Sequence, residues 1–248
     1  MTALAREARA LTPKSSRPGE AVALDGGCMV WLSGMGQDAA RQAALGLIDA
    51  GATALAVFGV AGALAPGMHS GTLFCPSVVI DERGQDMPTT LAWRSSLSQR
   101  LLAANLPLVT EGSLLSLSSP LLSAADKTSM RVHHQAMAVD MESAAVAAIA
   151  SERRLPFVVL RAIIDEHDED VPGELQAGID AWGRLLPIRM LALLLRHPSL
   201  WGELPGLATR MGHAIRALRA AARAAGNGLG RDPPEVRCNV HSSLSDAG

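Results

Sequence analysis

Short apolar runs alternate with alanine-rich stretches at helical spacing along the first two thirds of the chain. Nearly unbroken apolar runs of this length are typical of strands buried on both faces of a sheet. We therefore predict strands at 28–33, 53–60, 72–80 and 157–164, and helices at 2–11, 37–50, 93–105 and 143–155. Strands that alternate with helices predict an α/β fold, with three α/β/α layers around a central mixed sheet.

The last third of the chain has a different pattern. From residue 178 on, apolar positions recur at helical spacing and are interrupted by Pro187, Pro198 and Pro205, which predicts two or three helices broken at these prolines. The end of the chain is rich in Gly, Pro and Ser, a composition typical of disorder. We predict one domain over residues 1–222 and a disordered tail over residues 223–248.

Composition and charge exclude several classes of function. With 248 residues and 48% hydrophobic content, the chain can bury one sizeable core. Its net charge of −2 does not favour nucleic-acid binding, which depends on Lys and Arg to neutralise phosphates. The three cysteines are far apart and unpatterned, which fits a reducing cytosol. The N-terminus lacks a secretory pattern and no run is long enough to span a membrane, so we expect a cytoplasmic protein.

The stretch 138–170 carries the most informative chemistry. Asp140 and Glu142 come just before an alanine-rich helix, so we expect Glu142 in the first turn, where the helix dipole favours an ionised carboxylate. A buried strand follows, and Asp165 stands where that strand stops. Because open α/β sheets bind ligands at the carboxyl ends of their strands, we expect both acidic groups in one crevice.

Two glycine-rich turns follow the first two predicted strands. The first contains Gly34 and Gly36, and the second contains Val60 and Gly62. Such turns let a polar ligand approach the backbone closely. The first turn also matches the start of a dinucleotide-binding fingerprint. The next strand lacks the acidic residue that would hold a ribose, so we expect no nicotinamide site.

Taken in order, these motifs resemble the purine nucleoside phosphorylase and nucleosidase superfamily. The resemblance rests on the segments VDMES (139–143), LRAIID (160–165) and GVAGAL (59–64), together with the glycine turn GMG (34–36). It extends from residue 2 to about residue 170. The proline-broken C-terminal helices are most similar to the hopanoid-biosynthesis-associated branch, whose members act as adenosylhopane nucleosidases.

The resemblance implies roles for individual side chains. Asp165 falls on the general acid that protonates purine N7, so that the base leaves neutral. Met141 and Glu142 fall on the pair that contacts the ribose, and Glu7 aligns with the glutamate that orients the attacking water in nucleosidases. These roles suit the chemistry, because a proton on the base and negative charge near the sugar both stabilise the breaking of an N-glycosidic bond.

The same resemblance implies that the glycine turns of Gly34, Gly36, Val60 and Gly62 line the place of the nucleophile, water or phosphate. A phosphorylase holds a phosphate dianion, normally with arginine and hydroxyl donors. Val60 stands where a serine or threonine would supply a hydroxyl, and neither turn contains arginine. With Glu7 present, this pattern favours water as the nucleophile.

The chain departs from the family pattern in three places. The family's first strand precedes the segment equivalent to residues 3–7, at which this sequence begins. We therefore expect either an upstream start or a sheet without that edge, and in the second case a loosely held Glu7. Ser118 and Pro120 stand where many nucleosidases have an Asp and a base-stacking Phe. Only 3% of the residues are aromatic, which predicts a largely aliphatic pocket.

The sequence thus predicts an enzyme, an N-ribosyl hydrolase that releases adenine from adenosylhopane in hopanoid biosynthesis. Two alternatives stay open: a phosphorylase or nucleosidase for a soluble purine nucleoside, and a catalytically degenerate nucleoside-binding protein. We expect a homo-oligomer that binds a purine nucleoside, free or lipid-linked, and no nucleic acid; peripheral contact with the inner membrane is left open. We expect no cofactor. We also expect no metal site, because the side chains of the adjacent His133 and His134 point away from each other in a strand or in a helix.

Overall fold

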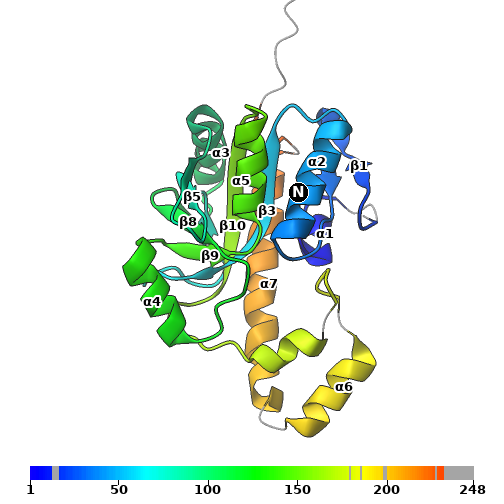
Figure 1. Cartoon of the computed structure of the whole chain (residues 1–248), viewed down its shortest axis with the longest axis vertical. Helices are drawn as coiled ribbons and strands as arrows, with labels where there is room; N and C mark the ends of the chain where they lie inside the picture. The colour runs from blue at the N-terminus through cyan, green and yellow to red at the C-terminus, as the bar shows by residue number, and fades with distance from the viewer. Residues whose placement is uncertain (13–16, 179, 185, 198–199, 227, 232–248) are drawn as a thin grey trace, which may run out of the picture.

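The computed structural model describes residues 1–12, 17–178, 180–184, 186–197, 200–226 and 228–231. A mixed sheet lies at its centre, with the strand order β6-β5-β8-β9-β3-β10-β4-β7 (Figure 1). Its strands are β3 (Leu55–Ala63), β4 (Leu73–Phe74), β5 (Val78–Ile80), β6 (Asp86–Pro88), β7 (Leu108–Val109), β8 (Ser113–Ser116), β9 (Ala138–Asp140) and β10 (Phe157–Asp165). A separate two-stranded sheet pairs β1 (Ala21–Ala23) with β2 (Met29–Trp31).

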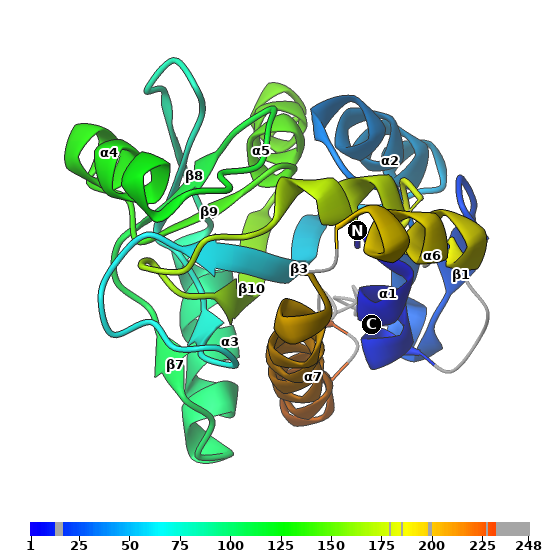
Figure 2. The same ribbon diagram turned by 90° about the horizontal axis from the view of Figure 1, so that it is seen from below.

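Helices cover both faces of the large sheet, which confirms the predicted three-layer α/β architecture. α2 (Gln37–Asp49) and α5 (Ser143–Glu152) lie on one face, and α1 (Ala5–Leu11), α3 (Leu91–Ala103) and α7 (Leu200–Ala225) lie on the other (Figure 2). The pattern of α2 explains its position, because Ala40, Ala43, Ala44 and Leu47 recur at helical spacing and are all buried. α4 (Ala124–His134) lies beside β8 and β9.

The central pair of strands, β3 and β10, is parallel and brings the ends of three strands together. Asp165 of β10 pairs with Gly62 of β3, and Gly62 pairs with Val139 of β9. Between Ile163 and Asp165 the register shifts by one residue, which is a β-bulge. Since side chains alternate between the faces of a strand, this extra residue turns Asp165 to the face opposite Arg161.

The N-terminal residues pair with two strands. The backbone nitrogen of Met1 donates to the carbonyl of Ala56, and the amide of Phe58 donates to the carbonyl of Met1. Thr2 forms a bridge with Leu32 on its other side. The backbone therefore enters α1 from a fixed position between β2 and β3.

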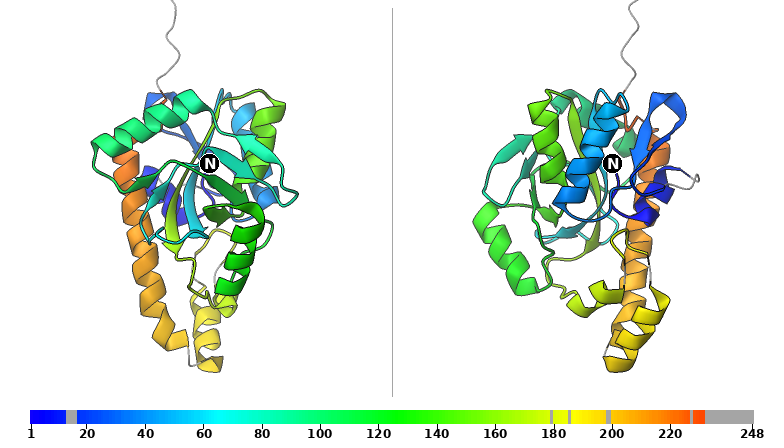
Figure 3. Two further views of the ribbon diagram at one scale, coloured as in Figure 1. Left: turned by 90° about the vertical axis from the view of Figure 1, so that its left-hand side faces the viewer. Right: turned by 45° about the vertical axis from the view of Figure 1, so that its right-hand side comes forward.

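The C-terminal third extends beyond the sheet. α6 (Pro187–Arg196) and the first half of α7 lie below the body of the molecule (Figure 3), and we call residues 187–211 the C-terminal arm. α6 begins at Pro187, as expected, but Pro205 lies inside α7 and does not end it. Pro205 is the sixth residue of α7, so its missing N–H removes one ladder bond, to the carbonyl oxygen of Trp201, and the helix continues past it. Pro198 lies outside the described residues.

Two other segments differ from the predicted pattern. The strand predicted at 72–80 is divided into β4 and β5, with Pro76 between them, because proline cannot donate a ladder hydrogen bond.

The domain also continues past residue 222: α7 runs to Ala225, and Leu229 is buried while its carbonyl accepts a hydrogen bond from Trp93 Nε1 (2.9 Å). The predicted tail otherwise falls on residues 232–248, outside the described residues. No helix in the described ranges is both long and apolar enough to cross a membrane.

Candidate active site

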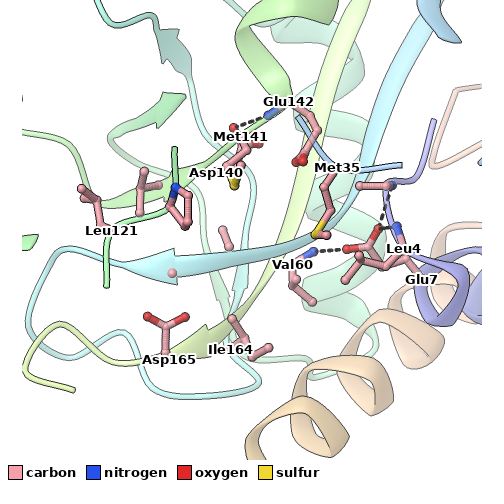
Figure 4. A pocket seen from close by; sticks show the side chains of 15 residues that line it. Leu4, Glu7, Met35, Val60, Leu121, Asp140, Met141, Glu142, Ile164 and Asp165 are labelled. Carbon is pink, nitrogen blue, oxygen red and sulfur yellow. Dashed lines mark hydrogen bonds between the residues drawn. The ribbon is translucent and has the colours of Figure 1, made fainter. Parts of the chain in front are cut away.

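A cavity opens where β3, β9 and β10 end (Figure 4). It encloses about 650 Å³, part of which is open to solvent. Four of the side chains that line it are acidic: Glu7, Asp140, Glu142 and Asp165. The others are apolar or lack a side chain: Ala3, Leu4, Met35, Val60, Ala61, Gly62, Pro120, Leu121, Val139, Met141 and Ile164. Among the described residues, no lysine or arginine lines this cavity, and its wall is aliphatic as the composition predicted.

Glu7 is buried and is held by backbone amides. Its Oε2 accepts hydrogen bonds from the amides of Ala3 (2.9 Å) and Leu4 (2.8 Å), and its Oε1 accepts one from Val60 (2.8 Å). The expectation of a loosely held Glu7 is wrong, because the segment before α1 supplies two backbone donors and β3 supplies a third. Burial raises the pKa of Glu7 to about 7, against the opposing effect of Arg161. A carboxylate with a pKa near neutrality is suited to accept a proton from water.

Arg161 is fully buried and organises the other two carboxylates on its side of the sheet. Its Nε donates to Asp140 Oδ2 (2.8 Å), and its Nη2 donates to the same oxygen and to Glu142 Oε2 (3.1 Å). Asp140 also accepts a hydrogen bond from the hydroxyl of Ser143, so its carboxylate holds neighbouring side chains in place. Burying a guanidinium is costly unless it is paired, and here one cation balances several nearby acids.

Glu142 combines a bond to this cation with a bond to the first glycine turn. It is the N-cap residue of α5, one position before the predicted first turn, and its Oε1 accepts from the amide of Gly36 (3.0 Å). Burial raises the pKa of Glu142, and the Arg161 guanidinium opposes this rise. The carboxylate is therefore held by Arg161 and the amide of Gly36, with no capping bond to α5, and desolvation opposes its predicted ionisation.

Asp165 has an ion-pair partner that the sequence analysis did not identify. Lys127 of α4 donates to Asp165 Oδ2, and Lys127 is fully buried. Burial raises the pKa of Asp165, and Lys127 opposes the rise. The only available sequence signal was rarity, since Lys127 is one of two lysines in a chain with 22 basic residues.

Some of the remaining predicted site residues line the cavity and others do not. Val60, Gly62 and Met141 line the cavity, whereas Gly36 acts through Glu142. Gly34 is not part of the lining; it lies against Ala181 and Trp182.

The loop in which Ser118 and Pro120 depart from the family pattern contributes Pro120 and Leu121 to the cavity. Ser118 is exposed, and its amide donates to Glu82 instead. His133 and His134 lie edge to face on α4, and no cluster of metal-ligating side chains occurs in the part of the chain that the structure describes.

Residues 12–196 match the family model described as the phosphorylase superfamily, which is most of the chain. The chain belongs to this superfamily. No curated protein matches it in sequence at a significant level. The superfamily placement agrees with the motifs VDMES and LRAIID, which lie at the cavity.

Solved structures with a similar fold cover nearly the whole chain. One is futalosine hydrolase of Helicobacter pylori, with 18% identity and a TM-score of 0.62 over 90% of this chain and 95% of that chain. Another is the 5′-methylthioadenosine/S-adenosyl homocysteine nucleosidase of Campylobacter jejuni, with 16% identity and a TM-score of 0.65 over 92% and 95%. The Helicobacter pylori nucleosidase with butyl-thio-DADMe-Immucillin-A has 18% identity and a TM-score of 0.61 over 90% and 95%.

Proposed function

We propose that the protein is a purine nucleosidase, a hydrolase of the N-glycosidic bond. The observation that carries this proposal is the arrangement of carboxyl groups around one cavity: Glu7 and Glu142 approach it from α1 and α5, and Asp165 from the end of β10. Such a bond breaks most easily when the base receives a proton while negative charge faces the electron-poor sugar. The names of the structural neighbours, which are nucleosidases and a futalosine hydrolase, support the same reaction class.

In the proposed reaction, each carboxyl group has a separate task. Asp165 gives its proton to purine N7, the bond between the base nitrogen and the sugar breaks, and its electron pair leaves with the neutral base. Water attacks the anomeric carbon and Glu7 accepts the proton that the water loses. Glu142 accepts hydrogen bonds from the sugar hydroxyls, and Met141 packs against the ribose. Water is consumed and the net proton count is unchanged.

Water is favoured over phosphate by the charge of the cavity. A phosphate dianion needs cationic or hydroxyl donors, whereas the described lining has four acidic side chains and no basic one. Arg161 is already paired with Asp140 and Glu142. Adenine release from 5′-methylthioadenosine should therefore be independent of added phosphate and should yield the free sugar. A phosphate-dependent rate with formation of a sugar 1-phosphate would establish a phosphorylase instead.

For the substrate, we propose adenosylhopane, which would be cleaved to adenine and ribosylhopane. Support comes from the aliphatic lining and from the path of the chain between the cavity and the C-terminal arm. Met35 donates its amide to the carbonyl of Ala181 (2.8 Å), and Ala5 donates to that of Trp182 (3.1 Å), so the segment leading to the arm crosses the rim. A polycyclic tail attached to the ribose could extend along this segment toward the apolar arm.

The decisive assay measures adenine release from adenosylhopane and from water-soluble nucleosides. Turnover of 5′-methylthioadenosine without any turnover of adenosylhopane would support the second candidate, a nucleosidase for a soluble purine nucleoside, which the structural neighbours favour. Purine binding without turnover of any substrate, unchanged by D165N, would identify a degenerate nucleoside-binding protein.

A further inference from the structure

Lys127 is a buried ammonium group whose three hydrogens are all used. It lies on α4 with no exposed surface, and its Nζ donates to Asp165 Oδ2 and to the carbonyl oxygens of Glu166 (2.8 Å) and Glu169 (2.9 Å). An ammonium ion has three donors and no acceptor. Burying it is costly unless all three are satisfied next to a compensating charge. The loop after β10 is therefore folded around this one cation.

The pairing divides the two oxygens of the Asp165 carboxyl group. Oδ2 is occupied by Lys127, while Oδ1 has no hydrogen-bond partner among the described residues. Asp165 lines the cavity, next to Gly62, and a side chain carbon at Gly62 would lie 3.0 Å from Asp165 Oδ2 and 3.2 Å from Oδ1. The absence of a side chain there leaves room for the carboxyl group on this side of β3. This geometry leaves Oδ1 as the oxygen that can carry a proton to a ligand.

We propose that Lys127 is the positioning residue of the proton donor: its ammonium group fixes Asp165 Oδ2 and leaves the Oδ1 hydroxyl free for the base. This inference rests on the proposed nucleosidase function. In the reaction, the Oδ1 proton passes to purine N7 while Oδ2 continues to accept from the ammonium. Lys127 keeps its three protons throughout. It acts only through Asp165 and does not line the cavity.

The charges around Asp165 determine how the cation acts. Lys127 faces it from α4, and Arg210 faces it from α7, where Arg210 Nη1 pairs with Glu169 Oε1 (2.6 Å). Glu169 lies on the loop itself, as does Glu166, whose Oε2 is 3.0 Å from His69 Nδ1.

Burial raises the pKa of Asp165, Lys127 and Arg210 oppose the rise, and Glu169 adds to it. Lys127 thereby keeps a protonated carboxyl group acidic enough to release its proton. Loss of the lysine leaves burial and Glu169 less opposed, so the pKa of Asp165 rises further.

The test compares the pH dependence of kcat/KM for adenine release in the wild type and in K127M. A general acid must be protonated, so activity is lost as the pH rises through the pKa of Asp165. In K127M this loss should move to higher pH by about one unit or more, and the maximal rate should fall by about tenfold or more because Asp165 is a weaker and misplaced acid. If folded K127M lost its activity at the same pH as the wild type (an unchanged basic limb of the pH profile), the proposal would be overturned.

Two further variants keep the test decisive. K127Q can still donate to the carbonyls of Glu166 and Glu169, so it should fold even if K127M does not, and its basic limb should move in the same direction. R131Q removes a positive charge from the same helix, where Arg131 Nη1 donates to the carbonyl of Ala136 (3.3 Å), and should leave the limb unchanged. A shift in R131Q equal to that in K127Q would contradict a specific role for Lys127.

A titration without substrate separates this inference from the proposed function. The carboxyl carbon of Asp165, labelled with ¹³C and assigned by comparison with D165N, reports its pKa directly. The pKa should be lower in the wild type than in K127Q even if no nucleoside is ever cleaved. Equal values would overturn the role of Lys127, whereas unequal values in a protein without activity would overturn only the nucleosidase.

Discussion

Glu7, Glu142 and Asp165 are similar chemical groups in three different surroundings. Glu7 is held by three backbone amides, Glu142 by Arg161 and the amide of Gly36, and Asp165 by Lys127. Backbone amides and cations favour the ionised form, while burial favours the neutral form. The balance between these effects differs at each site, which is how side chains of one type can fill the three proposed roles of base, sugar ligand and acid.

Removal of the acid or of the sugar ligand should lower turnover strongly. D165N removes the proton donor, and E142Q removes the negative charge near the sugar while keeping the size of the side chain. Each should reduce kcat/KM for adenine release by roughly 10²-fold or more, the typical contribution of a positioned acid or base. E152Q, at the exposed end of α5, is the matched control and should have wild-type activity. A loss of less than tenfold in D165N or E142Q would count against the assigned roles.

Glu7 should control the acid limb of the pH profile. As a base it must be ionised, and its pKa is raised to about 7 by burial, so activity should fall as the pH decreases below about 7. Measured kcat/KM should decrease by about tenfold per pH unit in that range. In E7Q the residual activity should be low and should not show this limb. An acid limb that persists unchanged in E7Q would assign it to another group.

At the level of elements, the packing of β3 against the buried charges depends on one glycine. A side chain carbon at Gly59 would lie 2.5 Å from both Arg161 Nη1 and Glu7 Oε1. G59A should therefore destabilise the fold by about 1–3 kcal/mol, the usual cost of overpacking a core, and displace Glu7. Chemical denaturation measures the first effect and kcat/KM the second.

Gly202 provides the control for this substitution. It lies near the start of α7, and a side chain carbon there would meet no atom within 4 Å. G202A should leave activity unchanged and should not lower stability, since alanine favours helix more than glycine does. If G59A and G202A had equal stability, the close approach at β3 would be of no consequence.

The elements themselves were largely predictable from the sequence, because buried strands such as β10 and helices such as α5 have strong local patterns. The bulge at the end of β10 was not, since it depends on pairing with β3 rather than on local residue preference. The ion pair of Asp165 with Lys127 was hidden for a similar reason. It joins two positions far apart in the chain, and only the packing of α4 brings them together.

The hydrogen bonds that hold Glu7 were also hidden from the sequence. The sequence identified the residue through its resemblance to known nucleosidases but led to an expectation of weak attachment. The amide of Val60, which is more than fifty residues away, is one of its donors at 2.8 Å. Residues that line the cavity were thus predictable where a motif carries them, and their hydrogen-bond partners were not where the partner is a distant backbone group.

On the scale of the whole molecule, the C-terminal arm carries two of the five large apolar side chains that are exposed among the described residues. Leu195 is 71% exposed and Trp201 is 57% exposed. If the arm shelters a lipid tail, the double variant L195A/W201A should raise KM for adenosylhopane by about tenfold or more, since each large apolar side chain contributes about 1.5–3 kcal/mol when fully buried and 1.4 kcal/mol is a factor of ten. KM for 5′-methylthioadenosine, measured in the same assay, should not change.

Val132 of α4 is the matched control, because it is 76% exposed and lies on a different part of the surface. V132A should leave both KM values unchanged. Equal effects of L195A/W201A on both substrates would argue against contact between the arm and a tail.

The bulge in β10 also gives the carboxyl groups of the cavity different charged neighbours. Arg161 is among the charges that act on Glu7 and Glu142 but not among the principal ones that act on Asp165, and the reverse holds for Lys127. The proposed acid therefore has a cation of its own, Lys127, although it lines the same cavity as Glu7 and Glu142. Acceptance of a new base could evolve through α4 and its loop while the machinery for the sugar stays intact.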